Sequence, residues 1–304
     1  MREGRARRFG GFAGVGAGAA IACASIERVV LETCERKGPA VKLLLHACCG
    51  PCSLEPTRLL AAAGHDITIY YANSNIAPRE EYARRLDTLE AWARDAGFPV
   101  IEGPYVPSTW EDTAGRIGDA AIAQVKAASE QPARACVLAV DPARRRARCR
   151  VCYRLRLEET ARVARERGFE GIGTTLSVSP YQYTDIIEEE VRRAARAEGI
   201  ADVFQDFRPY YDEATRKSRE LGMYRQNFCG CRISELEAAA ERAERKAQRA
   251  QEKAAYQAAH ADEIAAAQAA RRAHRAERAA YDKKQARKRA ILKALREQEK
   301  RGEA

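Results

Sequence analysis

The segment His46-Ala-Cys-Cys-Gly-Pro-Cys52 constrains the fold of this chain more than any other stretch. It follows residues 41–45, an apolar run typical of a buried strand, and it precedes residues 53–63, which have the pattern of a helix that ends at Gly64. Three thiols therefore lie on a strand-to-helix turn, where open α/β sheets bind ligands. Because a helix N-terminus offers backbone N–H groups and partial positive charge, it favours the thiolate form that binds metals or does redox chemistry.

Strands and helices alternate along the middle of the chain. We expect further strands at 66–72, 98–102, 171–178 and 203–207, and further helices at 80–96, 110–129, 149–167, 185–197 and 213–221. This alternation predicts a three-layer α/β fold with a mostly parallel sheet. Because right-handed crossovers place the carboxyl ends of parallel strands at one edge, Cys48, the loop 73–78 and Ser179-Pro180-Tyr181 should lie along that edge.

Composition divides the chain into three segments. Residues 1–38 are rich in Gly, Ala and Arg and predict a flexible N-terminal extension. Residues 39–234 predict one globular domain, and residues 235–304 predict a basic helical tail. Residues 1–25 have the basic beginning and small-residue end of a signal peptide but lack its apolar centre. No run approaches the ~18 apolar residues of a membrane span, so we expect a cytoplasmic protein without a membrane partner.

Net charge is unevenly distributed along the chain. The formal charge of +10 comes from the two ends: residues 232–304 hold 19 Lys/Arg and 12 Asp/Glu, residues 1–40 hold seven and four, and residues 41–231 are balanced. A charge run is usually a solvated face, so we favour a solvated tail helix held by i,i+4 charge pairs. The basic run 283–289 keeps open a second interpretation, an accessory nucleic-acid arm.

Seven of the ten cysteines fall into three tight groups, which are Cys48/Cys49/Cys52, Cys149/Cys152 and Cys229/Cys231. Such grouping in an intracellular enzyme favours metal or redox chemistry over a disulfide scaffold. The first two groups offer five thiols, and four thiolates suit zinc or an iron–sulfur cluster. Adjacent cysteines on a helix-starting turn are unusual for a zinc knuckle, which favours iron–sulfur. A structural zinc site between the sheet and the helix of Cys149 stays open.

The third group, Cys229-Gly-Cys231, has a spacing that allows a small, strained disulfide ring. Strained disulfides tend toward the labile or catalytic class, and a redox pair together with a cluster would form an electron path. These two cysteines could instead complete the same metal site.

Polar aromatic and basic residues follow several predicted strands. His46 could relay protons, although a single His is more often a structural hydrogen-bond partner. A set of Tyr and Arg side chains could stack on a base and hold phosphates, and core packing explains any one of them equally well. They are Tyr181, Tyr183, Tyr210, Tyr211, Tyr224, Arg208 and Arg225. No Gly-x-Gly-x-x-Gly or Walker motif follows the first strand, which argues against a tightly held dinucleotide.

Four signatures in this order resemble the cobalamin-independent epoxyqueuosine reductase family (QueH). They are His46-Ala-Cys-Cys-Gly-Pro-Cys52; Asn73-Ser-Asn-Ile-Ala-Pro78 with Glu81, Tyr82 and Arg85; Cys149-Arg-Val-Cys-Tyr-Arg-Leu-Arg-Leu157; and Ser179-Pro-Tyr-Gln182 followed by Tyr224-Arg-Gln-Asn-Phe-Cys-Gly-Cys231. The resemblance covers about residues 41–234, and the combination is highly specific, whereas each signature alone is not. It agrees with a sheet of the HUP, or Rossmann-like, class.

The resemblance implies reduction of epoxyqueuosine to queuosine at the wobble position of tRNA anticodons, the last step of queuosine biosynthesis. It implies a [4Fe-4S] cluster held by Cys48, Cys49, Cys149 and Cys152, with Cys229 and Cys231 as a redox-active disulfide. Cys52 falls where some members carry Asp and is a candidate ligand of one additional iron. The expected partners are tRNA and an unidentified electron donor.

The sequence also departs from the family pattern, and other functions stay in competition. Ala77 stands where a His is expected, the loop 131–148 is enlarged, and nothing carries over to the two terminal extensions. One competing hypothesis is a zinc-stapled RNA-binding module without catalysis. Another is a thiol-based sulfur or nucleotide transferase, which would bind ATP, yet the first strand-to-helix turn lacks a phosphate-cradling glycine run.

Overall fold

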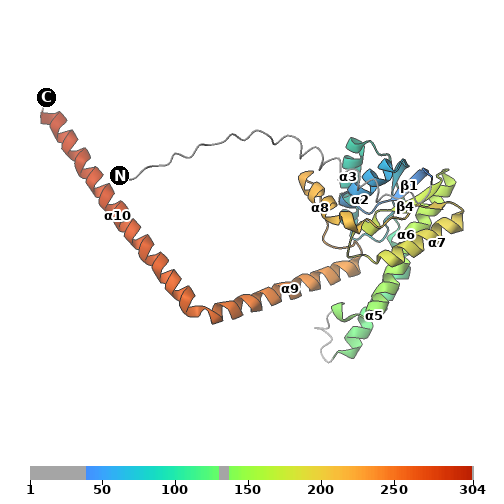
Figure 1. Cartoon of the computed structure of the whole chain (residues 1–304). Coiled ribbons are helices and arrows are strands. Elements are labelled where there is room, and N and C mark those ends of the chain that lie inside the picture. Colours follow the sequence, from blue (N-terminus) through green and yellow to red (C-terminus); the bar gives the residue numbers. More distant parts are fainter. Residues whose placement is uncertain (1–38, 130–136, 303–304) are drawn as a thin grey trace, which may run out of the picture. The chain divides into compact units, whose positions relative to one another are not determined.

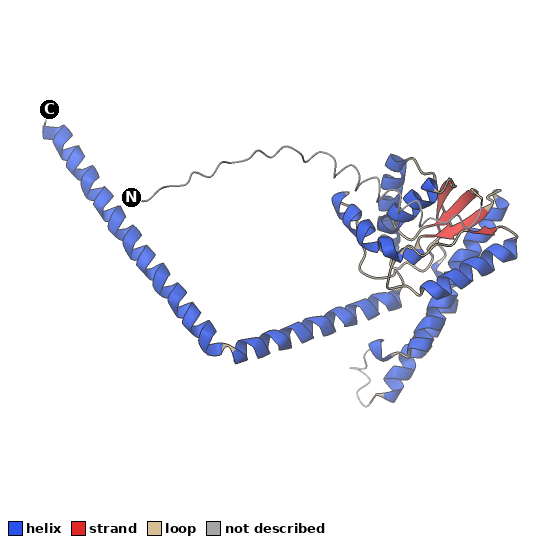
Figure 2. Cartoon of the chain, viewed as in Figure 1, coloured by secondary structure: helices blue, strands red, loops and turns tan. Residues whose placement is uncertain are grey.

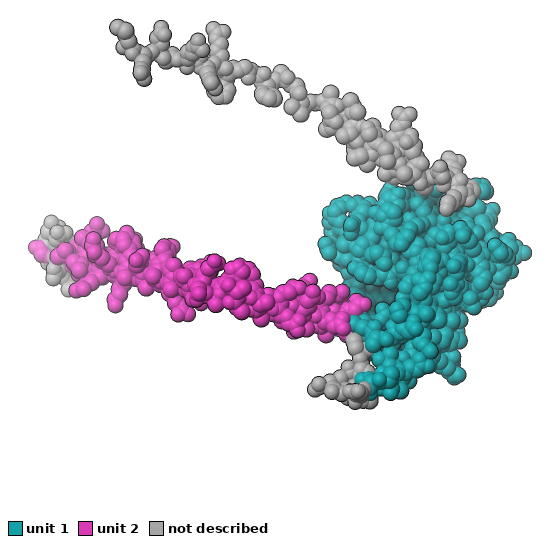
Figure 3. Space-filling model, turned by 60° about the horizontal axis from the view of Figure 1, so that its bottom comes forward, with its two compact units in different colours: residues 1–238 teal, residues 239–304 magenta. Residues whose placement is uncertain are grey.

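The chain consists of an α/β body and a C-terminal helical segment, and the computed structural model describes residues 39–129 and 137–302. The predicted N-terminal extension, 1–38, lies outside the described residues. The chain divides into two compact units, 1–238 and 239–304 (Figure 3). Among the described helices, none combines the length and the apolar character needed to cross a membrane.

The body contains a five-stranded sheet in the order β3-β2-β1-β4-β5, and all neighbouring strands are parallel. The strands are β1 (Lys42–His46), β2 (Asp66–Tyr71), β3 (Val100–Glu102), β4 (Gly171–Thr174) and β5 (Ala201–Asp202). This is the strand order of a Rossmann-like sheet, so the predicted fold class is confirmed. The central strand is β1, where Leu45 pairs with Ile69 on one side and Gly173 on the other.

Helices cover both faces of the sheet, which gives the three predicted layers (Figures 1 and 2). One face packs against α2 (Gly50–Ala62), α3 (Arg79–Ala96) and α8 (Tyr211–Glu220), and the other against α6 (Pro142–Glu166) and α7 (Thr184–Glu198). Side chains alternate along a strand, so Leu43 and Leu45 enter the first layer and Leu44 enters the second. All three leucines are fully buried, and each contributes roughly 2 kcal/mol of apolar burial.

The predicted strand 203–207 is wrong. The last backbone hydrogen bond between this segment and β4 runs from Val203 N to Ile172 O. Strand β4 ends at Thr174, and a 3-10 turn, η4 (Leu176–Val178), follows it. No ladder remains for residues 204–207 to extend. Gly173 allows the close approach of this segment, because a Cβ there would lie 2.9 Å from Val203 O.

Two of the helices that begin earlier than the sequence predicted carry cysteines. Helix α2 starts at Gly50 with Pro51 in its first turn, which places Cys52 inside the helix. Helix α6 starts at Pro142, because the Asp141 side chain accepts a hydrogen bond from Ala143 N at 2.7 Å and caps it. Cys149 therefore lies two turns inside α6 rather than at its start.

The remaining elements connect these layers and form the tail. They are α4 (Pro107–Trp110), the π-helical turn η1 (Glu111–Gly115), α5 (Arg116–Ala128), the 3-10 turns η3 (Val137–Ala139) and η5 (Arg208–Tyr210), α9 (Arg232–Ala259) and α10 (Ala261–Gly302). The predicted helix 110–129 is thus divided into the end of α4, the π-helical turn η1 and helix α5. The long C-terminal helical extension is confirmed.

Candidate metal and redox site

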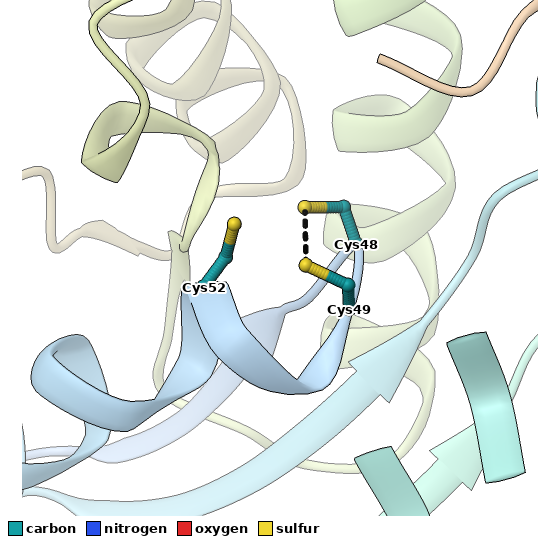
Figure 4. Close-up of side chains that lie close together, drawn as sticks. All are labelled: Cys48, Cys49 and Cys52. Atoms are coloured by element: carbon teal, nitrogen blue, oxygen red, sulfur yellow. Dashed lines mark hydrogen bonds between the residues drawn. The ribbon is translucent and has the colours of Figure 1, made fainter. Parts of the chain in front are cut away.

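The first group of thiols lies at the carboxyl end of β1, on the turn that begins α2. Cys49 is the N-cap residue of α2, and Cys52 follows in its first turn. The sulfur atoms of Cys48, Cys49 and Cys52 lie within 4.8 Å of one another (Figure 4), with 3.8 Å between the first two. Among the described residues, these form the one group of three or more His, Cys, Asp or Glu side chains close enough to hold a metal ion.

Hydrogen bonding among the three thiols separates their pKa values. The pKa of Cys49 is well below its usual range, because Cys48 and Cys52 donate to its sulfur and Gln226 Nε2 lies 2.9 Å from it. The bond with Cys49 raises the pKa of Cys48, although the bond with Cys52 acts against it, and the bonds with Cys48 and Cys49 raise the pKa of Cys52 well above its usual range. The arrangement favours the thiolate of Cys49 over those of Cys48 and Cys52, and the positive charge of a metal would stabilise all three thiolates together.

The second group lies on one face of α6. Cys149, Cys152, Tyr153 and Arg156 follow the spacing i, i+3, i+4, i+7, which places their side chains on the same side of a helix. Burial raises the pKa of Cys149 to about 12 and that of Cys152 to about 11. Cys149 packs against the buried cluster that contains Cys48 and Cys49, so the first two groups share a border.

The third group precedes α9 and adjoins the second. Cys231 is buried in a cluster with Cys152 and Trp110, and burial raises its pKa to about 12. The Cys229 sulfur lies 3.8 Å from Gln182 Oε1, which also accepts a hydrogen bond from Tyr153 OH at 2.6 Å. All seven cysteines of the three groups are free thiols in this structure, so the predicted disulfide stays a prediction.

The Cys229–Cys231 loop is docked on the loop 73–78 that follows β2. Ala77 N donates to Gly230 O at 2.9 Å, and Gly230 has a φ of +139°. A Cβ at Gly230 would lie 2.9 Å from Ile76 Cγ1 and 3.2 Å from Asn75 Nδ2. Glycine is therefore required between the two cysteines by its backbone angle and by its contact.

A buried arginine connects the three groups electrostatically. Arg156 Nη2 donates to Asn73 Oδ1 at 2.6 Å, and Asn73 Nδ2 donates to Ala47 O, next to Cys48, at 2.9 Å. Within the part of the chain that the structure describes, Arg156 Nε and Nη1 have no hydrogen-bond partner. Burial alone would lower the pKa of Arg156. Its interactions with one cysteine of each group outweigh the effect of burial and raise the pKa, and these cysteines are Cys152, Cys48 and Cys229. A buried cation with unpaired donors suits an anionic group at this site.

His46 has a structural environment. Its side chain is fully buried, and Nδ1 lies 2.9 Å from Thr174 Oγ1 on the neighbouring strand β4. Burial lowers the pKa of His46 to about 3, so the ring stays neutral at physiological pH. This favours the hydrogen-bonding role over the proton relay.

Of the five tyrosines proposed to stack on a base, Tyr181 is the one whose side chain is largely exposed to solvent. It is 80% exposed, and its one ring neighbour, Tyr211, lies 6.3 Å away edge-on. The ring of Tyr183 is covered by the Arg146 guanidinium at 4.8 Å, and Tyr224 OH donates to Glu81 Oε2 at 2.7 Å. Tyr210 and Tyr211 pack at the border of the core.

A cavity of about 410 Å³ lies away from these groups. It is lined by Tyr70, Glu102, Gly103, Pro104, Glu159, Arg162, Val163, Glu166 and Arg167. None of these lining residues is a predicted site residue, so the cavity is not part of the candidate site.

Sequence reasoning missed two residues of the site. Trp110 packs with Cys152 and Cys231, and its Nε1 has no hydrogen-bond partner among the described residues. Arg156 is part of the third signature but received no role, because an arginine within an Arg-rich helix is normally solvated. Its position seven residues after Cys149 was the available signal, since that spacing repeats the same helix face.

Comparison with known proteins identifies similar chains. A family model described as epoxyqueuosine reductase QueH matches residues 43–124 and 121–237. The epoxyqueuosine reductase QueH of Thermotoga maritima is 34% identical over 206 residues, which cover 66% of this chain and 94% of that protein. Those of Staphylococcus epidermidis and Dehalococcoides mccartyi are 29% and 26% identical, over 67% and 65% of this chain and 80% and 94% of theirs. The family match ends before α10 begins.

Proposed function

This chain belongs to the epoxyqueuosine reductase QueH family, and we propose that it reduces epoxyqueuosine to queuosine at the wobble position of tRNA, the last step of queuosine biosynthesis. One observation carries the proposal: the buried guanidinium of Arg156 lies close enough to a thiol of each cysteine group for all three thiols to raise its pKa. Residues more than a hundred positions apart thus contribute to one centre. The centre combines metal-binding thiols with a separate, closely spaced thiol pair.

The reaction can be balanced with the groups of this chain. Conversion of an epoxide to an alkene breaks two C–O bonds and consumes two electrons and two protons, with release of water. The thiols of Cys229 and Cys231 supply two electrons and two protons when they form one S–S bond. An external electron donor must then return two electrons, with two protons from solvent, to restore the dithiol.

The donor set suits a [4Fe-4S] cluster held by Cys48, Cys49, Cys149 and Cys152. Burial disfavours free thiolates at Cys149 and Cys152, and the unpaired nitrogen atoms of Arg156 offer compensation for an anionic cofactor. When bound, such a cluster supplies one-electron transfer. Cys52, in contact with both Cys48 and Cys49, remains available for one additional iron.

The wobble nucleoside can be held by an exposed ring at the same edge of the sheet. Tyr181 follows β4 and precedes Gln182, which contacts both Cys229 and Tyr153. Bases of a single-stranded anticodon loop can splay out and stack on aromatic rings, each stack contributing roughly 1–3 kcal/mol. We therefore propose Tyr181 as the stacking platform that brings the epoxide toward the thiol pair.

The proposal is tested by anaerobic reconstitution with iron and sulfide, followed by turnover of epoxyqueuosine-containing tRNA. We expect broad visible absorption from the wild-type protein, loss of this absorption in Cys149→Ser, and normal absorption without turnover in Cys229→Ser. Nucleoside analysis of tRNA from cells lacking the protein should show accumulated epoxyqueuosine. Normal queuosine in that tRNA would refute the function.

A zinc-stapled RNA-binding module is the second candidate, and the three neighbouring thiols favour it. Sulfur atoms within 4.8 Å of one another match the spacing around a single metal ion. Metal analysis of anaerobically purified protein separates the candidates. Stoichiometric zinc, together with absence of turnover after iron and sulfide are supplied, would support the module.

A further inference from the structure

Helix α10 carries a concentration of positive charge that the proposed reductase chemistry does not use. Between residues 271 and 296 the sequence holds eleven Lys/Arg and two Asp/Glu, a net charge of +9. The basic residues are Arg271, Arg272, Arg275, Arg278, Lys283, Lys284, Arg287, Lys288, Arg289, Lys293 and Arg296, and all are exposed. This segment lies outside the family match, which ends at residue 237.

Among the side chains that the structure describes, these cations have no ion-pair partner, unlike many arginines of the body. In the body, Arg150, Arg154 and Arg193 all bind the carboxylate of Glu190. In α10, none of the side chains that the structure describes, residues 261–297, makes an ion pair. The i,i+4 charge pairs expected of a solvated helix are therefore absent from α10 in the described region. Its charge is free to attract an anionic partner.

The charges are arranged as a stripe. At 100° per residue, six of them fall within an arc of about 60°, interrupted by Asp282, and the stripe is about 38 Å long. They are Arg271, Arg275, Arg278, Arg289, Lys293 and Arg296. The exposed Ile291 and Leu295 lie on the other side of the helix, and Leu292 lies beside the stripe. Lys284 and Lys288 separate these residues from Tyr281. Because no continuous apolar face is left, the pattern favours a polyanion over a membrane or a helical partner.

We propose that α10 is a binding arm for the phosphate backbone of RNA, and that it holds the tRNA on which the body acts. The identity of the RNA rests on the proposed function. The body between residues 41 and 231 has no net charge, so it offers little general attraction for a polyanion. A helix rich in Ala presents its guanidinium and ammonium groups at fixed spacing, and counterion release on phosphate binding supplies affinity without base recognition.

The test uses the full-length protein and an unmodified tRNA transcript with a queuosine-type anticodon. In the arm variant, Arg271, Arg275, Arg278 and Arg289 are changed to Gln. The matched control changes Arg242, Lys246, Arg249 and Lys253 of α9 to Gln, which removes the same charge from an equally exposed stripe. Circular dichroism should show equal helix content in all three proteins, because Gln is a good helix former.

Fluorescence anisotropy between about 50 and 200 mM salt should show at least about tenfold weaker binding by the arm variant. The slope of log affinity against log salt should fall by about 3, because up to four phosphate contacts are lost. The α9 control should bind within about threefold of wild type. Unchanged affinity and slope in the arm variant, or an equal loss in the control, would overturn the proposal.

Two further measurements separate the alternatives. Binding to vesicles of phosphatidylcholine and phosphatidylserine that is lost in the arm variant, while its tRNA binding is unchanged, would replace the RNA arm with a membrane arm. Reductase turnover is assayed on the same preparations. Loss of tRNA binding in the arm variant supports the RNA-binding arm even if the wild-type protein shows no turnover. Turnover by the wild-type protein, together with unchanged tRNA binding by the arm variant, refutes the arm but not the proposed reductase function.

Discussion

Arg85 donates a hydrogen bond from Nη1 to the backbone carbonyl oxygen of Cys229 at 2.9 Å, across 144 residues of sequence. Its Nη2 lies 3.3 Å from Phe228 O, and its Nε donates to Glu81 Oε1 at 2.7 Å. The Arg85 side chain is fully buried in α3. The guanidinium therefore fixes the position of the thiol pair relative to the carboxyl edge of the sheet.

Replacing Arg85 with Lys should loosen the thiol pair while keeping the positive charge. One ammonium group cannot reproduce the planar fork that serves Glu81 and two carbonyl groups. We expect anaerobic alkylation of Cys229 to become severalfold faster and the free energy of unfolding to fall by about 2 kcal/mol. Mass spectrometry of the alkylated peptide measures the first, and urea unfolding the second.

The neighbouring Arg84→Lys is the control for this change. Arg84 stacks over the ring of Tyr224 at 4.9 Å, and among the described residues no hydrogen bond joins it to Cys229. Its substitution should leave the alkylation rate unchanged. An unchanged alkylation rate in Arg85→Lys as well would show that the two carbonyl bonds do not restrain the loop.

Gly230→Ala should be more destabilising than an alanine at another glycine with positive φ. Both Gly230 and Gly168 have positive φ, yet a Cβ at Gly168 meets nothing within 4 Å, whereas one at Gly230 meets Ile76 at 2.9 Å. We expect a loss of about 1 kcal/mol for Gly168→Ala and about 3 kcal/mol for Gly230→Ala in urea unfolding. Equal losses would mean that the contact with Ile76 relaxes without cost.

Glu190 should stabilise the packing of α6 against α7 in a pH-dependent way. Burial alone would raise the pKa of Glu190, but hydrogen bonds from Arg154, Arg193 and Arg150 outweigh it and lower the pKa. A lowered carboxyl pKa means that the stabilisation is present above the unfolded pKa of about 4.3 and is lost as pH falls through the folded pKa.

We therefore expect Glu190→Gln to lower the free energy of unfolding by about 2 kcal/mol at pH 7, because the three arginines are partly exposed. The difference from wild type should shrink below about pH 4. Thermal unfolding across this pH range measures it. Glu188→Gln, which removes an exposed pair with Arg192, should cost less than about 0.5 kcal/mol.

The fold was predictable from local signals, because those signals lie close together in sequence. Gly97 and Gly199 end α3 and α7 with left-handed backbone, as expected of glycine at a helix end. The apolar run before His46 formed the central strand. Where the prediction failed, at residues 203–207, the decisive fact was the short length of β4, which no local pattern in 203–207 could reveal.

The candidate site was predictable in its thiols and not in their surroundings. Spacing alone grouped the cysteines, since a C-x-x-C pair returns to the same helix face after one turn. The residues that position them are distant in sequence: Arg85 reaches Cys229, and Gln226 reaches Cys49. Arg148 and Arg156 have the composition of a solvated helix face, yet both are buried, and only tertiary packing decides this.

Arg156→Met should separate the charge of Arg156 from its structural contribution. Without metal, two of its nitrogen atoms are buried and unpaired, but the substitution also removes the donor of Asn73 Oδ1, so the free energy of unfolding of the metal-free protein should fall by no more than about 2 kcal/mol. With metal, an anionic thiolate centre loses its nearby cation, and we expect about tenfold weaker retention of iron in a chelator competition. Arg165→Met, on an exposed position of the same helix, should change neither quantity. Unchanged iron retention in Arg156→Met would show that this guanidinium does not compensate the charge of the centre. If the metal-free Arg156→Met protein is unfolded, the role of Arg156 is purely structural.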